Sequence, residues 1–153
     1  MGFVDYLIKN NTIICNLEVK TWEESIIKGG QILVDKGVTT PEYMETIVSK
    51  CKKNGPYIVI APGIAMPHGR PEEGGLKLGY AIVTLKNPIK FNDLDNDPIR
   101  LLIFMAAPDI KSHNEKAVCE IADICDNERV VDKIINSKSP IEIIEILKEI
   151  NNG

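Results

Sequence analysis

Two histidines supply all the imidazole groups of this chain of 153 residues, and the sequence around each is suited to phosphate chemistry. His68 lies in a Pro/Gly-rich loop, residues 61–75, that follows an apolar run. Pro67 and Pro71 restrict the backbone on either side of the histidine, while Gly69 removes a side chain beside it. This pattern favours an imidazole nucleophile that is held yet approachable. A histidine packed against a surface turn is the alternative interpretation.

His113 falls in Ser112-His-Asn-Glu115, which has the form of a helix capping box. If Ser112 is the N-cap, His113 is the first helical residue and lies beside unsatisfied backbone N–H groups. The positive end of the helix dipole there favours an anion and disfavours imidazolium. A neutral ring with one N–H to donate would help to hold a phosphoryl group. A polar residue tolerated at a helix start is the alternative.

Basic residues near these segments could neutralise a phosphate: Lys50, Lys52, Lys53 and Arg70. Arg70 is the strongest candidate because it lies two residues from His68, although each of the four also suits a solvated surface.

Metal chemistry has less support in the sequence. The acidic run 93–97 has the spacing of a calcium loop, but Pro98 stands where such a loop needs glycine. A zinc site of His113, Cys119 and Cys125 has unsuitable spacing, because residues six apart on a helix do not share a face. The chain also lacks a Walker loop, a dinucleotide-binding glycine motif and a metalloprotease motif. We therefore predict no metal and no cofactor.

Alternating helical and strand-like patterns must position these residues, and they predict one α/β domain over residues 1–153. Capping residues, proline starts and apolar spacing predict helices, and short β-branched runs predict buried strands. The expected helices are residues 21–37, 40–54, 112–125 and 139–150, and the expected strands are residues 12–16, 57–60, 78–85 and 99–106. The strands form a sheet between helical layers.

Charge and composition limit the class of partner. Acidic residues outnumber basic ones 22 to 18, for a formal net charge of −4, which argues against nucleic acid. No apolar run reaches the ~18 residues of a membrane span, so no membrane insertion is expected. The four cysteines form no Cys-x-x-Cys pair, and the first ten residues do not have the pattern of a signal peptide. We expect a cytoplasmic protein that meets small molecules or other proteins.

A family resemblance rests on the run Gly55-Pro-Tyr-Ile-Val-Ile-Ala-Pro-Gly-Ile-Ala-Met-Pro-His-Gly-Arg-Pro-Glu72, on residues 82–88, and on Ser112-His113 ahead of a helix. Over nearly the whole chain the sequence resembles enzyme IIA of the bacterial sugar phosphotransferase system, of the mannitol/fructose type. Within that family it is most similar to the ascorbate branch. The resemblance implies a mixed sheet of about five strands flanked by helices on both faces.

The resemblance also implies roles. His68 would accept a phosphoryl group from phospho-HPr and pass it to the IIB component of a sugar permease, and the similarity to the ascorbate branch implies that this sugar is ascorbate. His113 would stabilise the phosphoryl group, with Arg70 and the backbone around Gly69 as further phosphate contacts. Mannitol-type members carry a phosphate-facing arginine at the end of the helix before the loop, where this chain has Ser49-Lys-Cys-Lys52. The residue after His113 is Asn114, where leucine is common.

Two other functional hypotheses stay open at this point. The first is a regulatory module that binds partners according to its phosphorylation state and is not coupled to sugar transport. The second is a thiol enzyme that uses Cys51 or Cys119, which rests only on cysteine count and helix placement.

Overall fold

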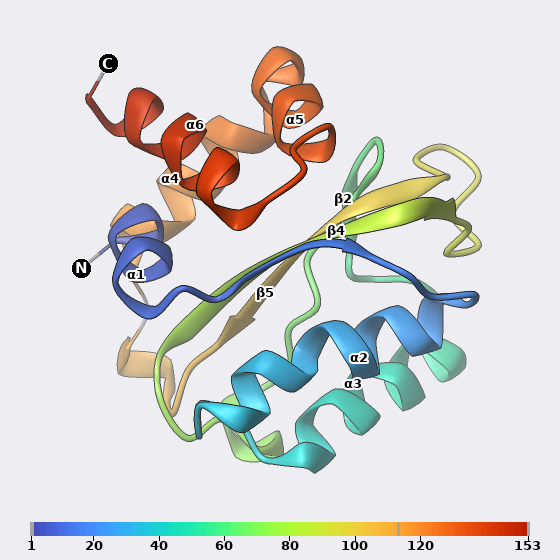
Figure 1. Ribbon diagram of the computed structural model, residues 1–153. Helices are drawn as coiled ribbons and strands as arrows, with labels where there is room; N and C mark the ends of the chain where they lie inside the picture. The colour runs from blue at the N-terminus through green and yellow to red at the C-terminus, as the bar shows by residue number, and fades with distance from the viewer. Residues whose placement is uncertain (1, 113, 153) are drawn as a thin grey trace.

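A five-stranded sheet lies between two helical layers in the computed structural model, which describes residues 2–112 and 114–152 (Figure 1). Helices α2 and α3 cover one face of the sheet, and α1, α4, α5 and α6 cover the other. The elements are α1 (Phe3–Asn10), β1 (Ile13–Leu17), α2 (Trp22–Asp35), α3 (Pro41–Asn54), β2 (Val59–Ala61), β3 (Ile64–Ala65), the 3-10 turn η1 (Pro71–Glu73), β4 (Gly79–Ile89), β5 (Ile99–Ala106), the 3-10 turn η2 (Ile110–Ser112), α4 (Glu115–Cys125), α5 (Glu128–Ile135) and α6 (Pro140–Asn152).

The sheet is mixed, with the strand order β1-β4-β5-β3-β2. Strands β1 and β4 run parallel, β4 and β5 antiparallel, β5 and β3 parallel, and β3 and β2 antiparallel. The predicted fold class, a mixed sheet of about five strands with helices on both faces, is confirmed.

The central strands β4 and β5 are mostly apolar over residues 79–85 and 101–106, where both faces of the sheet are covered. Val83 and Phe104 point into the core under α2 and α3, while Ile82 and Ile103 point into the second core under α1, α4, α5 and α6. All four side chains are fully buried. These two strands therefore form the rigid centre on which the surrounding loops are built.

The helix starts of α2 and α3 follow their predicted signals. Thr21 caps α2, its side-chain oxygen accepting from the Glu24 N–H at 3.2 Å. Pro41 occupies the first turn of α3, where a missing N–H costs little. Thr40 stands at the predicted cap position, but its side chain makes no cap hydrogen bond.

The strand predicted at residues 57–60 is only partly right. Strand β2 is Val59–Ala61, and it lies at the edge of the sheet, with the Ile60 side chain 43% exposed. The buried strand next to it is β3, which falls inside the segment predicted as a loop. The two strands form a tight hairpin in which Gly63 takes a φ of 77°, a conformation that suits glycine.

The predicted start of the helix after residue 112 is wrong. Asn114 is the N-cap of α4, its side chain accepting from the Ala117 N–H at 3.2 Å. Ser112 instead ends η2, where its N–H and hydroxyl both donate to the Asp109 carboxylate. Asparagine and serine cap helices about equally well, so the contact with Asp109 decides between them.

Helices α1 and α5 were not predicted, and β4 extends four residues beyond the predicted strand 78–85. No helix in the described ranges has both the length and the apolar character that crossing a bilayer requires.

Candidate active site

His68 lies in the loop between β3 and η1, and its side chain is half-buried. Its ring Nδ1 is 2.6 Å from the carbonyl oxygen of Met66. A carbonyl oxygen can only accept, so Nδ1 carries the proton and the neutral ring presents an unprotonated Nε2. Within the described residues no group hydrogen-bonds to Nε2. The ring is thus held in one tautomer, with its nucleophilic nitrogen available.

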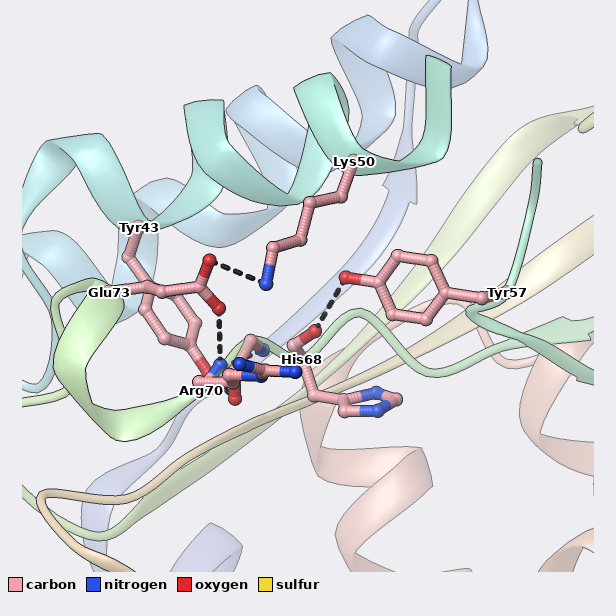
Figure 2. Close-up of polar contacts among 7 residues, drawn as sticks. Tyr43, Lys50, Tyr57, His68, Arg70 and Glu73 are labelled. Carbon is pink, nitrogen blue, oxygen red and sulfur yellow. Dashed lines mark hydrogen bonds and ion pairs between the residues drawn. The ribbon is translucent and has the colours of Figure 1, made fainter. Parts of the chain in front are cut away.

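Two tyrosine hydroxyls contact the backbone beside the histidine (Figure 2). The Tyr57 hydroxyl donates to the carbonyl oxygen of His68 at 3.0 Å, and the Tyr57 ring meets the imidazole in a T-shaped contact with centroids 5.7 Å apart. Tyr43, from α3, accepts from the Gly69 N–H at 2.8 Å and donates to the Met105 carbonyl oxygen at 3.0 Å. The loop is therefore tied both to α3 and to strand β5.

The sequence analysis gave Gly69 two roles, a position without a side chain beside His68 and a backbone contact to phosphate. A Cβ at this position would lie 3.3 Å from the Tyr43 ring, so the absence of a side chain lets α3 approach the loop closely. Its N–H, however, is already donated to Tyr43. The predicted role of Gly69 in binding phosphate stays a prediction, and its N–H would first have to leave that partner.

An acidic side chain, Glu73, links the loop to α3. Its carboxylate accepts from the Arg70 N–H at 2.7 Å and forms an ion pair with Lys50 Nζ at 2.6 Å (Figure 2). Burial raises the pKa of this carboxyl, but the contacts with Lys50 and Arg70 outweigh it, and the pKa is lowered overall. The backbone of Arg70 is thus fixed, while its side chain is exposed beside His68.

A cavity of about 270 Å³ lies between the His68 loop and the start of α4 and is lined by residues of both segments. Gly69 lines it on the loop side, and Ser112 and Asn114 line it on the side of α4. His113 lies outside the described residues, and its predicted contact with the phosphoryl group stays a prediction. Its two chain neighbours nevertheless border the same cavity as the His68 loop.

An apolar groove of about 290 Å³ runs from β2 to α4 and is lined in part by Met66 and Met105. Ile60 and Val118 line it as well, and they are 43% and 41% exposed. Exposed aliphatic side chains around a groove are typical of a surface that another protein covers.

Comparison with known proteins identifies the family to which this chain belongs. Residues 6–150 match the family model of the phosphoenolpyruvate-dependent sugar phosphotransferase system, EIIA 2. The chain belongs to this EIIA family. It is therefore a phosphotransferase component of a sugar phosphotransferase system, a class of protein that carries a phosphoryl group on histidine.

Individual relatives agree with the family match. The chain is 41% identical to the ascorbate-specific PTS system EIIA component of Salmonella choleraesuis, over 99% of this chain and 98% of that one. Its fold matches the mannitol-specific cryptic phosphotransferase enzyme IIA CmtB of Escherichia coli with a TM-score of 0.83 and 30% identity, over 97% and 99% of the two chains. It also matches the complex of enzyme IIAMTL and phosphorylated enzyme IIBMTL from Escherichia coli, with a TM-score of 0.75 and 26% identity, over 90% and 94%. The ascorbate-type resemblance read from the sequence is confirmed.

The structure separates the basic residues proposed for this EIIA. Lys50 faces the loop but is paired with Glu73, whereas Lys52 and Lys53 are exposed near the end of α3. Among the four, Arg70 is the one whose own backbone belongs to the histidine loop.

The thiol hypothesis loses one of its two candidates. Cys51 is buried in the core under α2 and α3, and burial raises its pKa to about 11, so it is a neutral thiol at pH 7. Cys119 is exposed on α4. The acidic run 93–97 forms a turn in which the Asp97 carboxylate accepts from the N–H groups of Phe91 and Asp93 at 2.8 and 3.0 Å.

Three residues of the EIIA site were missed from sequence: Tyr43, Tyr57 and Glu73. Tyr43 was read only as part of the apolar face of a helix, and Tyr57 only as part of a strand. A weak signal for Tyr57 was available, since this tyrosine directly follows Gly-Pro and lies in the turn just before the edge strand β2. No local signal marks Glu73, whose partner lies on α3.

Proposed function

We propose that His68 of this EIIA accepts a phosphoryl group on Nε2 from phospho-HPr and passes it to the IIB component of a sugar permease. The observation that carries the assignment is the 2.6 Å contact between Nδ1 and the Met66 carbonyl oxygen, which leaves Nε2 as the nucleophile. The hydrogen bond also stabilises the positive charge that the ring gains when Nε2 forms its new bond.

The chemistry needs no general base, because Nε2 is already unprotonated. Its lone pair attacks phosphorus as the bond from phosphorus to the donor breaks, and that electron pair returns to the donor. Transfer to IIB reverses these events, with Nε2 as the leaving group. Phosphoryl transfer depends mainly on alignment and on stabilising the equatorial oxygens, which are the roles predicted for the loop and for His113 and Arg70.

Protein partners suit the surface around His68. Tyr57 and Ile60 are 40% and 43% exposed, and the apolar groove lies beside them. The structurally similar enzyme IIAMTL forms a complex with phosphorylated IIBMTL. This likeness supports docking of an acceptor IIB on the same face. A net charge of −4 and the partners named here fit a cytoplasmic protein with no nucleic-acid partner.

Ascorbate is the proposed transported sugar. The relatives that are 40–41% identical over 99% of this chain are ascorbate-specific EIIA components. Transfer from the phosphorylated protein to a purified ascorbate-type IIB should be faster than transfer to a mannitol-type IIB. Equal rates would contradict this assignment and leave the histidine assignment untouched.

The test of the histidine assignment is phosphorylation with phosphoenolpyruvate, enzyme I and HPr. We expect an acid-labile, base-stable phosphate that mass mapping places on His68 and that His68→Ala abolishes. His113→Ala should be labelled more slowly or lose its label sooner. Persistent labelling of His68→Ala would overturn the assignment, and an unchanged rate and lifetime in His113→Ala would remove its role.

A further inference from the structure

One peptide unit of the loop is held at both of its ends by tyrosine hydroxyls. The carbonyl of His68 and the N–H of Gly69 belong to the same planar group and point in opposite directions. Tyr57 donates to that oxygen at 3.0 Å, and Tyr43 accepts from that N–H at 2.8 Å. Because Tyr43 lies on α3 and Tyr57 lies in the turn before β2, the unit is held from two separate places.

The backbone just before this unit is already anchored. The Met66 N–H donates to the Ile58 carbonyl at 2.7 Å, and the Met105 N–H donates to the Pro67 carbonyl at 3.2 Å. The freedom that is left is rotation of the unit between His68 and Gly69, which glycine permits more readily than other residues. The tyrosine contacts therefore act on the one part of the loop that is otherwise easily turned.

The two tyrosines differ in how deeply they are placed. Tyr43 is 1% exposed, and its hydroxyl also donates to the Met105 carbonyl, so its loss would leave partly buried backbone groups unpaired. Tyr57 is 40% exposed, so water can replace its hydroxyl at the His68 carbonyl without disturbing the core. Burial raises the pKa of Tyr57 to about 12, so the hydroxyl stays a donor across the working pH range.

We propose that Tyr57 and Tyr43 are positioning residues that orient the His68–Gly69 peptide unit and thereby aim Nε2 of His68 at the incoming phosphorus. The inference rests on the proposed function of His68. Neither tyrosine hydroxyl hydrogen-bonds to the imidazole, and both act through the backbone to which it is attached. A small misalignment of a nucleophile costs a large factor in rate, which gives the contacts their value.

Tyr57→Phe is the decisive variant because it keeps the ring against the imidazole and removes only the hydroxyl. We expect the single-turnover rate of phosphorylation from phospho-HPr to fall on the order of 10-fold, with the donor concentration for half-maximal rate unchanged. The matched control is Tyr6→Phe on α1, a tyrosine of the other hydrophobic cluster, which should keep the wild-type rate.

Nitrogen NMR of the His68 ring in the unphosphorylated protein supplies a second readout. The wild type should show a single tautomer with the proton on Nδ1, and Tyr57→Phe should show a mixture of tautomers or exchange broadening. A rate within twofold of wild type together with an unchanged ring spectrum would overturn the inference, while labelling of wild-type His68 would still uphold the proposed function.

Labelling of the wild-type protein distinguishes failure of the proposed function from failure of the positioning role. If wild-type protein takes no label on His68, that function falls and the ring spectra alone decide the positioning role. A Tyr57→Phe spectrum that differs from wild type, with Tyr6→Phe unchanged, then supports the tyrosine contacts, and identical spectra overturn them.

Discussion

The two segments that border the cavity between the loop and α4 are held in place by different means. Around His68 the hydrogen bonds join distant parts of the chain: Gly69 to Tyr43, 26 residues away, and Tyr43 to Met105, 62 residues away. Around Ser112 and Asn114 the capping hydrogen bonds span three residues each, and one further side-chain hydrogen bond joins Asn114 to Tyr80 of β4. The geometry of the His68 loop thus depends on contacts with α3 and β5, whereas the segment around Ser112 and Asn114 is held mainly by caps within a few residues and by the one contact with Tyr80.

The largest loss of stability is expected from Tyr43→Phe, which removes the long-range contacts of the His68 loop. Loss of the hydroxyl leaves the partly buried Gly69 N–H and Met105 carbonyl without their partner, which should lower the free energy of unfolding by about 1–3 kcal/mol. Urea denaturation measures the change. Tyr57→Phe, at an exposed position, is the control and should change stability by less than about 0.5 kcal/mol. Equal stabilities of the two variants would show that the long-range contact is not what holds the loop.

A substitution in the segment around Ser112 and Asn114 should lower the stability less than Tyr43→Phe does. Asn114→Ala removes the side-chain acceptor for the Ala117 N–H together with the hydrogen bond to Tyr80, and the lost cap should cost about 1 kcal/mol of stability, the usual value for an N-cap. Asn114→Ser, which keeps a capping oxygen, is the matched control and should recover most of the loss. Nitrogen NMR should find the His68 ring unchanged in both variants. A shifted ring signal would mean that the two walls are coupled.

The smallest effect concerns Glu73 and depends on pH. Its pKa is lowered in the folded protein, so its contacts with Lys50 and Arg70 stabilise the fold fully above the unfolded carboxyl pKa of about 4.3. That stability is lost as pH falls through the lower, folded value. Glu73→Gln should therefore cost about 0.5–1 kcal/mol at pH 7 and less in acid.

The neighbouring Glu72→Gln is the control for this prediction, because Glu72 is exposed and forms no ion pair with a described residue. Denaturation curves between pH 3 and about 7 measure both variants. Parallel pH profiles of Glu73→Gln and wild type would remove the ion pair from the description of the loop.

The same contrast explains what the sequence could predict. The Pro67-His68-Gly69 run predicts the loop, because proline and glycine restrict or free their own backbone. Thr21 and Pro41 likewise predict helix starts, because their effect is on the backbone next to them. The apolar composition of the runs in β4 and β5 likewise predicts that these strands are buried.

The remaining errors concern choices that local sequence leaves open. Ser112 and Asn114 are both good caps two residues apart, and the carboxylate of Asp109 decides between them. The edge position of β2 depends on which strand pairs with β5, a matter of topology. The tyrosine contacts could not be predicted because they join residue types that are equally at home in a core or a strand.

Met105 of β5 has a practical consequence. Its N–H and carbonyl hold the loop through Pro67 and Tyr43, while the residue also lines both the 270 Å³ cavity and the 290 Å³ groove. The chain has only four methionines. Carbon-13 labelling of their methyl groups would give a sparse spectrum in which Met105 is a built-in reporter. Its signal would register both the arrival of a partner on the groove and any rearrangement of the loop, with no foreign probe attached.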